Sequence, residues 1–228
     1  MKNDLIFKGT LIATFITKNK IYLLSEGRVI DKRDGTIRDD WSKIHKINNQ
    51  VGMLVAGIYV PNLRDDIIRN CKERNLTSVK DVANISSLVL QEIWKQFTAN
   101  PENKDKIKNV RIFVFLIGFD ENKAPHLFYI DNMSEPKFKL QERALFQSGC
   151  ELEIGAMSHA SGKTEDPSAI LLKYITPYIT PKGKQIDLKR ILYSAFNSTK
   201  KELAEKSRQI GGKTFFVEIE IKNGYKDL

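Results

Sequence analysis

Residues 10–28 read TLIATFITKNKIYLLSEGR, two short apolar runs joined by a polar turn. The runs at 11–17 and 21–25 are rich in β-branched and aromatic residues, and the Lys-Asn-Lys between them is a turn signal, so the segment is typical of a β-hairpin. The same pattern returns in KIHKI at 43–47 and VGMLVAG at 51–57, which an Asn-Asn turn joins. The N-terminal part of the chain therefore predicts two successive hairpins.

Two amphipathic helices are predicted next. The first covers residues 61–74, and the second begins at Ser78, with an acidic residue, Asp81, in its first turn and an apolar stripe that continues to Trp94. Each helix would cover a sheet with its apolar face and meet solvent with its polar face. In the first helix that apolar face consists of Leu63, Ile67, Ile68 and Cys71.

The second half of the chain repeats the order of strands and then helices. After a charged loop, the predicted strands are 110–119, 126–131, 137–140 and 143–147. Helices are then predicted at 168–179 and 187–207, and a last strand at 213–221. No repeat or linker divides the chain. This order predicts helices layered on both faces of stacked sheets.

The composition is that of a compact protein of 228 residues, 41% of them hydrophobic, with a net charge of +9. The charge is spread along the chain, so it indicates no particular partner. The two cysteines, Cys71 and Cys150, argue against a disulfide-stapled secreted fold. The N-terminus lacks a secretory signal and no apolar run is long enough to cross a bilayer, so we expect a soluble protein of the cytoplasm with no membrane partner.

Several patterns with other chemistry fail on spacing. GAMSHASGKT has six residues between Gly155 and Gly162, whereas a phosphate-binding loop needs four between its glycines. Cys150 lies near Ser148, and we interpret it as a small buried residue rather than a thiol nucleophile. The histidines lack the spacing of metal ligands: they are His45, His126 and His159. We therefore expect no metal and no cofactor.

Polar residues that could carry chemistry lie at the strand ends of the N-terminal hairpins. Thr10 opens the first strand, Glu26 ends the second, Arg28 follows it, and Lys43 begins the third. Taken singly, each is an ordinary polar residue at a strand end. A threonine hydroxyl becomes a useful nucleophile only where a base removes its proton, and a free α-amine on the same residue is such a base.

As a set, these residues resemble the proteasome β-subunit and the peptidase of the bacterial two-component ATP-dependent protease, both N-terminal-nucleophile hydrolases. Glu26 follows Thr10 by 16 residues, as the acidic residue follows the nucleophilic threonine in that family. Lys43 is at the position of the catalytic lysine and Gly57 at that of the oxyanion-hole glycine. Ser148, in QSGCELEIGA, is at the position of the active-site serine.

A further hairpin, IGFDENKAPHLFYID at 117–131, also matches the family pattern. The resemblance implies an α+β fold, a four-layer αββα sandwich of two stacked antiparallel sheets. It also implies that residues 10–228 form a single domain with an insertion at about 158–185. Residues 1–9 would be a pro-segment removed by self-cleavage between Gly9 and Thr10.

The implied activity is that of a threonine-type endopeptidase that hydrolyses peptides or unfolded proteins inside a homo-oligomeric ring, with an ATPase or cap as a possible partner. In that mechanism Glu26 keeps Lys43 ionised and oriented, the Gly57 N–H faces the oxyanion, and Ser148 completes the network around the amine. Arg28 has a structural role. Val55 and Tyr59 would border the substrate pocket.

The chain also departs from the family pattern. Lys206 stands where proteasome β-subunits have an aspartate of the active-site network, and Gln209 where they have a serine. The segment QIGGK at 209–213 is similar to the Ile-Ala-Gly-Asp-like sequence of the bacterial relative, and Ser207 would substitute in part for the missing groups.

Three other functions remain open at this point. The chain could be a non-catalytic structural subunit that keeps the fold, or an amidohydrolase of the same superfamily that acts on a small amide. A nucleic-acid-binding module is the weakest alternative, because no aromatic and basic platform accompanies the charge. We therefore expect no nucleic-acid partner.

Overall fold

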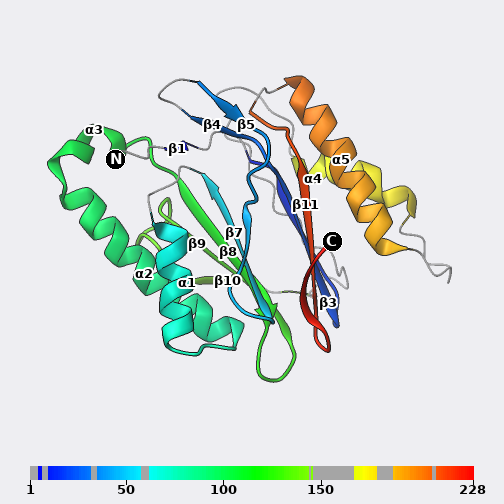
Figure 1. The fold of residues 1–228 in the computed structure, drawn as a ribbon, viewed down its shortest axis with the longest axis horizontal. Helices are drawn as coiled ribbons and strands as arrows, with labels where there is room; N and C mark the ends of the chain where they lie inside the picture. Colours follow the sequence, from blue (N-terminus) through cyan, green and yellow to red (C-terminus); the bar gives the residue numbers. More distant parts are fainter. Residues whose placement is uncertain are drawn as a thin grey trace.

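The computed structural model describes residues 5–6, 10–31, 35–57, 62–143, 145, 167–178, 187–206 and 209–228. These residues form four layers, with two stacked sheets in the middle and helices on both outer faces (Figure 1). Every pairing between described strands is antiparallel. The predicted α+β class and the four-layer αββα sandwich are therefore confirmed.

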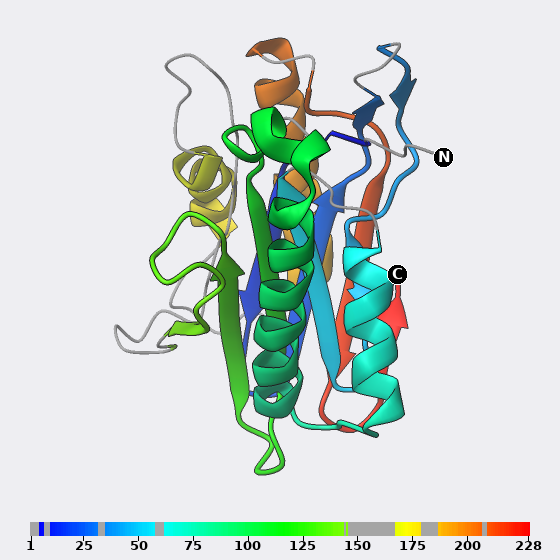
Figure 2. The same ribbon diagram turned by 90° about the vertical axis from the view of Figure 1, so that its left-hand side faces the viewer.

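The five-stranded sheet has the strand order β10-β9-β8-β7-β6. Its strands are β6 (Ile44–Lys46), β7 (Val51–Gly57), β8 (Ile112–Phe119), β9 (Pro125–Asp131) and β10 (Gln141–Arg143). Two helices lie side by side on its outer face, as Figure 2 shows. They are α1 (Leu63–Glu73) and α2 (Val79–Ala99).

The four-stranded sheet has the strand order β12-β11-β3-β2. Its strands are β2 (Ile12–Ile16), β3 (Lys20–Glu26), β11 (Thr214–Glu220) and β12 (Gly224–Asp227). The helices that pack on its outer face are α4 (Pro167–Ile175), the short 3-10 helix η2 (Thr176–Tyr178) and α5 (Leu188–Lys206).

A small third sheet stands apart from these layers. It joins β1 (Leu5–Ile6), β4 (Val29–Asp31) and β5 (Ile37–Arg38) in the order β1-β4-β5. The charged loop after α2 also contains short helices, η1 (Pro101–Asn103) and α3 (Lys104–Ile107).

Strand β2 illustrates how the sequence builds the two inner layers. Alternate side chains of a strand point to opposite faces of its sheet. Ile12 and Ile16 belong to the apolar cluster between the two sheets. Leu11, Ala13 and Phe15 belong to the cluster under α4 and α5. Both faces of β2 are thus buried, which explains its nearly continuous apolar run.

The two predicted hairpins and the first two helices are confirmed. Strand β2 pairs with β3, and β6 with β7. On α1, Leu63, Ile67 and Cys71 are buried. Ser78 caps α2, because its hydroxyl accepts a hydrogen bond from the Lys80 N–H at 3.3 Å.

The predicted strand at 137–140 is wrong. Phe138 has φ = 59°, in the left-handed region, and its N–H donates to the Asp131 carbonyl at 2.7 Å, so the chain turns there. Strand β10 begins only at Gln141. Strand β12 was not predicted, and neither were β1, β4 and β5, because segments of two to four residues are too short to show the periodicity of a strand. The predicted helix at 168–179 ends at Ile175, since Pro177 has no N–H to continue it.

Candidate active site

Thr10 lies at the start of β2, beside the end of β3. Ile12 pairs with Ser25, and the Glu26 N–H donates to the Leu11 carbonyl at 3.0 Å. Continued by two residues, the same register places Thr10 opposite Gly27, the residue after Glu26. The Thr10 side chain is buried, and its hydroxyl has no hydrogen-bond partner among the described residues. The hydrogen-bonding capacity of this hydroxyl is therefore unused within the described part of the chain.

Glu26 and Lys43 form a buried ion pair between the two sheets. Glu26 ends β3 and is 0% exposed, and Lys43 precedes β6 and is 1% exposed. The Lys43 ammonium contacts the Glu26 carboxylate. It also donates to the backbone carbonyls of Glu26 and Arg28, each at 3.1 Å. The ammonium thus has three acceptors, which fix its position.

Backbone groups hold the second oxygen of the Glu26 carboxylate. Glu26 Oε2 accepts from the Arg28 N–H at 2.7 Å and from the Gly211 N–H at 3.3 Å. Gly27 closes the site from the other side, since a Cβ there would lie 2.7 Å from the Asp39 carbonyl oxygen and 2.9 Å from that of Lys213. The carboxylate is therefore enclosed by main chain, which leaves little freedom for Glu26 to move.

Burial shifts the pKa of both partners. It raises the pKa of the Glu26 carboxyl and lowers the pKa of the Lys43 ammonium, because a low-dielectric interior disfavours either charge. The attraction between the two groups opposes both shifts. Lys43 consequently gives up its proton more readily than a surface lysine does. Perturbed groups of this kind are typical of reactive sites.

Arg28 supports the site through an ion pair that the sequence did not reveal. Its Nε lies 2.7 Å from Asp39 Oδ1 and its Nη2 lies 2.9 Å from Oδ2, a bidentate arrangement. Its Nη1 donates to the Ile210 carbonyl at 3.4 Å. Hydrogen bonding between the partners raises the pKa of Arg28 and lowers the pKa of Asp39. Arg28 thereby links the end of β3 to the loop before β11.

Gly57 and Val55 lie on β7, whose start pairs with β6. Gly57 has φ = +102°, and a Cβ there would lie 2.0 Å from the Arg111 carbonyl oxygen, so only glycine fits. The Val55 N–H donates to the Lys43 carbonyl at 3.1 Å, and its side chain packs on the cluster under α1 and α2. The structure thus connects β7 to Lys43 directly.

A model of the proteasome subunit family matches residues 6–135. The chain belongs to the proteasome subunit family. The match covers the hairpins that carry Thr10, Glu26 and Lys43, together with α1 and α2, and it agrees with the four-layer fold. Comparison with curated proteins yields no match.

The remaining predicted site residues of this proteasome-family chain fall in other places. Gly9, Tyr59, Ser148 and Ser207 lie outside the described residues. Lys206, the last residue of α5, has its ammonium 4.0 Å from the Glu202 carboxylate. Within the described ranges, no cluster of three or more His, Cys, Asp or Glu could hold a metal, and no helix is long and apolar enough to cross a membrane.

Lys200 is a supporting residue that sequence reasoning missed. It projects from α5, and its ammonium donates to the Gly212 carbonyl at 2.7 Å and to the Thr214 hydroxyl at 2.6 Å. It therefore holds the loop whose Gly211 N–H reaches Glu26. On a helix with many charged residues, nothing in the pattern distinguishes Lys200 from its exposed neighbour Lys201.

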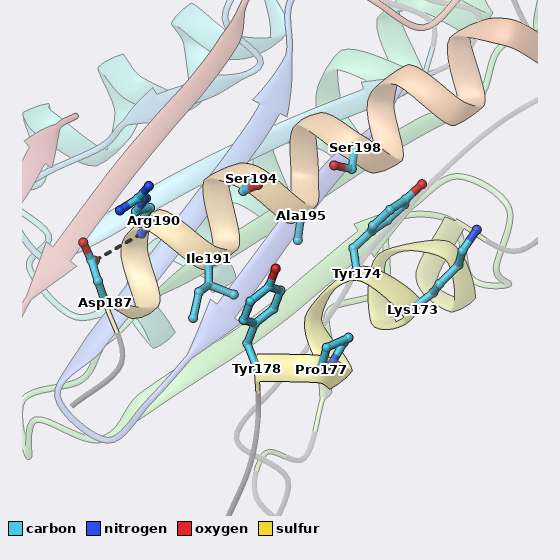
Figure 3. A pocket seen from close by; sticks show the side chains of 10 residues that line it. All are labelled: Lys173, Tyr174, Pro177, Tyr178, Asp187, Arg190, Ile191, Ser194, Ala195 and Ser198. Atoms are coloured by element: carbon cyan, nitrogen blue, oxygen red, sulfur yellow. Dashed lines mark hydrogen bonds between the residues drawn. The ribbon is translucent and has the colours of Figure 1, made fainter. Parts of the chain in front are cut away.

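A pocket of about 490 Å³ lies elsewhere, between α4, η2 and α5. Figure 3 shows Tyr178 and Arg190 at its border, with the Arg190 N–H bonded to the Asp187 carboxylate. None of the predicted site residues lines it, and it is separated from the Glu26–Lys43 pair by the four-stranded sheet.

Proposed function

We propose that this proteasome-family chain is a threonine-type endopeptidase whose nucleophile is Thr10. The observation that carries the proposal is the buried Glu26–Lys43 pair at the end of the hairpin that begins with Thr10. Self-cleavage between Gly9 and Thr10 would remove residues 1–9 as a pro-segment and leave residues 10–228 as the mature domain. Cleavage also supplies a free α-amine, whose reference pKa of about 7.7–8.0 suits a base near neutral pH.

The reaction follows from these groups. The Thr10 hydroxyl loses its proton to the α-amine, with Lys43 stabilising the developing negative charge, and its oxygen attacks the carbonyl carbon of the scissile bond. The leaving amine takes the proton, and an ester on Thr10 remains. Water then hydrolyses the ester and restores the hydroxyl. Gly57 would donate its N–H to the oxyanion, a contribution commonly worth about 3–4 kcal/mol, and Ser148 would complete the network.

Strand β1 indicates how a peptide could approach the site. Leu5 and Ile6, within the proposed pro-segment, pair with Asp31 and Ile30 of β4. Loss of residues 1–9 would leave this edge of β4 open, and an extended peptide could pair there in the place of β1. Val55 and Tyr59 would then border the pocket for the substrate side chain.

The assembly is part of the same proposal. Members of the family assemble into rings, which supports an oligomeric state for this chain. We propose that the rings contain this one subunit and enclose the site, and that an ATPase or cap delivers unfolded substrate. Soluble rings in the cytoplasm would fit this role.

A non-catalytic structural subunit is the second candidate. The observation that favours it is that Lys43 already has three acceptors, all from Glu26 and Arg28, while Thr10 is buried. A pair held in this way could serve only to join the two sheets. Lys206, in place of the family aspartate, points in the same direction.

Intact mass and peptide hydrolysis, measured on the same preparations, separate the two candidates. Wild-type protein should lose residues 1–9 and hydrolyse unstructured peptides, whereas Thr10→Ala should stay full length and inactive. Thr14→Ala is the matched control, because Thr14 lies on the same strand with a buried hydroxyl that also lacks a partner among the described residues. A wild-type chain that stays uncut and inactive would support the structural subunit, and hydrolysis by Thr10→Ala would remove Thr10 from the mechanism.

A further inference from the structure

A groove of about 730 Å³ lies at the side of the sandwich where the five-stranded sheet ends. Strand β6 is the edge of that sheet and contacts β3 of the other sheet. In the four-stranded sheet β11 and β12 continue beyond β3, so they extend past β6. Helix α1 forms the opposite wall of the groove, on the side of the molecule where Figure 2 shows α1 near the C-terminus. The space beside β6 is thus bounded by a sheet and a helix.

The backbone of β6 is open on the groove side at Lys46, whereas the N–H and C=O of Ile44 both bond to the Ser42 hydroxyl, at 3.2 and 3.1 Å. Lys43 and Ile47 are bonded to β7, through Val55 N–H to Lys43 O and Ile47 N–H to Val51 O, each at 3.1 Å. In an antiparallel strand the intervening residues point their N–H and C=O the other way. Those of Lys46 have no backbone partner within the described part of the chain. An open edge of this kind is a template for a further strand.

The floor of the groove is apolar and already suited to cover a strand. Phe215 and Val217 of β11 and Tyr225 of β12 line it, and all three pack on the cluster between the sheets. On the opposite wall, Ile68 of α1 is half-buried. A strand placed beside β6 would bury side chains on both of its faces, as the other strands of this sheet do.

The charge of the lining side chains is positive. Lys46, Lys72 and Lys213 are exposed. The ammonium of Lys46 lies 5.4 Å from the centre of the Tyr225 ring, and that of Lys213 lies 5.5 Å from the centre of the Phe215 ring, so aromatic faces hold both.

The other ionisable groups of the lining leave this surplus in place. Arg64 lies 2.7 Å from the Asp65 carboxylate, so these two charges offset each other, and Asp227 is the other lining carboxylate. His45 is neutral at physiological pH, because burial, with a smaller effect of Arg64, lowers its pKa to about 4. Among the side chains of the lining, three lysines therefore remain against one carboxylate, that of Asp227.

We propose that this groove binds an extended acidic segment of a partner protein, which adds to the five-stranded sheet as a strand beside β6. Its backbone would bond to Lys46, its apolar side chains would lie on the floor, and its carboxylates would pair with the lysines. The surplus of positive charge selects an acidic partner over a neutral or basic one. Neither Glu26 nor Lys43 lines this groove, although Ser42 and Ile44 on either side of Lys43 do, and binding there does not depend on catalysis.

Fluorescence anisotropy with a labelled Val-Glu-Val-Glu-Val-Glu peptide tests the proposal. The protein is the full-length Thr10→Ala variant, so that the peptide cannot be hydrolysed and a failure of the proposed peptidase function has no effect on the result. Saturable binding is expected. The Lys46→Glu/Lys213→Glu double variant should bind about tenfold more weakly or worse, since both lysines change from attraction to repulsion. The matched control is Lys201→Glu/Lys222→Glu, which changes two exposed lysines outside the groove and should leave binding unchanged.

Two further peptides test the mode of binding. The Val-Lys analogue should bind more than tenfold more weakly, and N-methylation of alternate residues should abolish binding, because strand addition needs the peptide N–H groups. Absence of saturable binding, equal binding by the double variant, or equal binding of the N-methylated peptide would each overturn the proposal. Self-association of the chain would also overturn the proposal if the double variant abolished it and the acidic peptide did not inhibit it. The groove would then bind a second copy of the chain.

Discussion

The two ends of β3 each carry an ion pair between a lysine and a glutamate, in opposite surroundings. At the end we call closed, Glu26 and Lys43 are both fully buried. At the end we call open, the Lys20 ammonium lies 2.8 Å from the Glu218 carboxylate and also contacts that of Glu220. The Lys20 side chain is 43% exposed. Burial lowers the pKa of Lys43, whereas the hydrogen bonds that the Lys20 ammonium donates to Glu218 and Glu220 raise the pKa of Lys20. The same pair of residue types therefore gives lysines with opposite proton affinities.

This difference teaches that solvent, rather than the partner, decides what such a pair can do. At the open end water screens the charges and the pair contributes little to stability. At the closed end the cost of desolvation is large, and each charge depends on the other. A buried charge near a nucleophile acts more strongly on developing negative charge than an exposed one, because less water screens it. The closed end thus has the buried, perturbed groups expected of the proposed active site, whereas the open end is a surface contact.

The largest expected effect comes from breaking the closed pair. Glu26→Gln leaves a buried ammonium without its counter-charge and should lower the free energy of unfolding by about 3–5 kcal/mol. The matched substitution at the open end, Glu218→Gln, should cost less than about 1 kcal/mol. Urea denaturation of both variants measures this contrast. Equal losses in the two variants would mean that burial does not separate the two ends.

Crowding the closed end should have the next largest effect. A Cβ at Gly27 would meet two backbone carbonyl oxygens, so Gly27→Ala should destabilise the fold by about 2 kcal/mol. Gly35→Ala is the control, because nothing lies within 4 Å of its Cβ position and its φ of +74° adds only a backbone penalty of about 1 kcal/mol. Thermal and urea denaturation give both values. A Gly27→Ala protein as stable as the wild type would contradict the tight enclosure of Glu26.

A smaller effect on stability is expected from breaking the Arg28–Asp39 ion pair, which supports the closed end. Asp39 is about half exposed, so Asp39→Asn should cost below about 1 kcal/mol at neutral pH. Arg28 lowers the pKa of Asp39, so its contribution is present above the unfolded-state pKa and is lost as the pH falls through the folded-state value. The wild type and the variant should therefore converge in stability as the pH falls below the ordinary carboxyl value of 3.8, which denaturation at several pH values would show. A difference that persists in acid would assign the effect to lost packing instead.

The sequence predicted the layered fold and the residues of the closed pair better than it predicted the short strands and the residues that support the pair. The nearly continuous apolar runs in 11–16, 21–24 and 51–57 are typical of strands that are buried on both faces, and such runs are visible in the sequence directly. Glu26 and Lys43 were identified through the resemblance to the proteasome family, whose spacing from the threonine they match. The strand predicted at 137–140 failed because Phe138 is apolar but lies in a turn, where the local pattern is overridden by the bond to Asp131.

Asp39, Gly211 and Lys200 were missed for a different reason. Each contacts the site across a long stretch of sequence, through a charge or a backbone N–H that has no local signature. Asp39 lies in a polar run where every residue is a candidate for solvent exposure. Only the fold shows which member of such a run faces Arg28. Supporting groups of an active site are therefore harder to predict than the residues they support.

The titration of the lysine ammonium groups tests the central claim most directly. In protein labelled with ¹³C at the lysine side chains, NMR titration follows each ammonium, and Lys43→Arg and Lys20→Arg assign the two signals. The folded-state pKa of Lys43 is lowered, so between its folded-state and unfolded-state pKa values the unfolded chain binds more protons, and the contribution of Lys43 to stability rises with pH. The folded-state pKa of Lys20 is raised, so its contribution to stability falls as the pH rises. We predict that Lys43 titrates below its ordinary value of 10.5 and Lys20 above it. A Lys43 that titrates at or above 10.5 would contradict the account, because the closed pair would then be only a contact between strands.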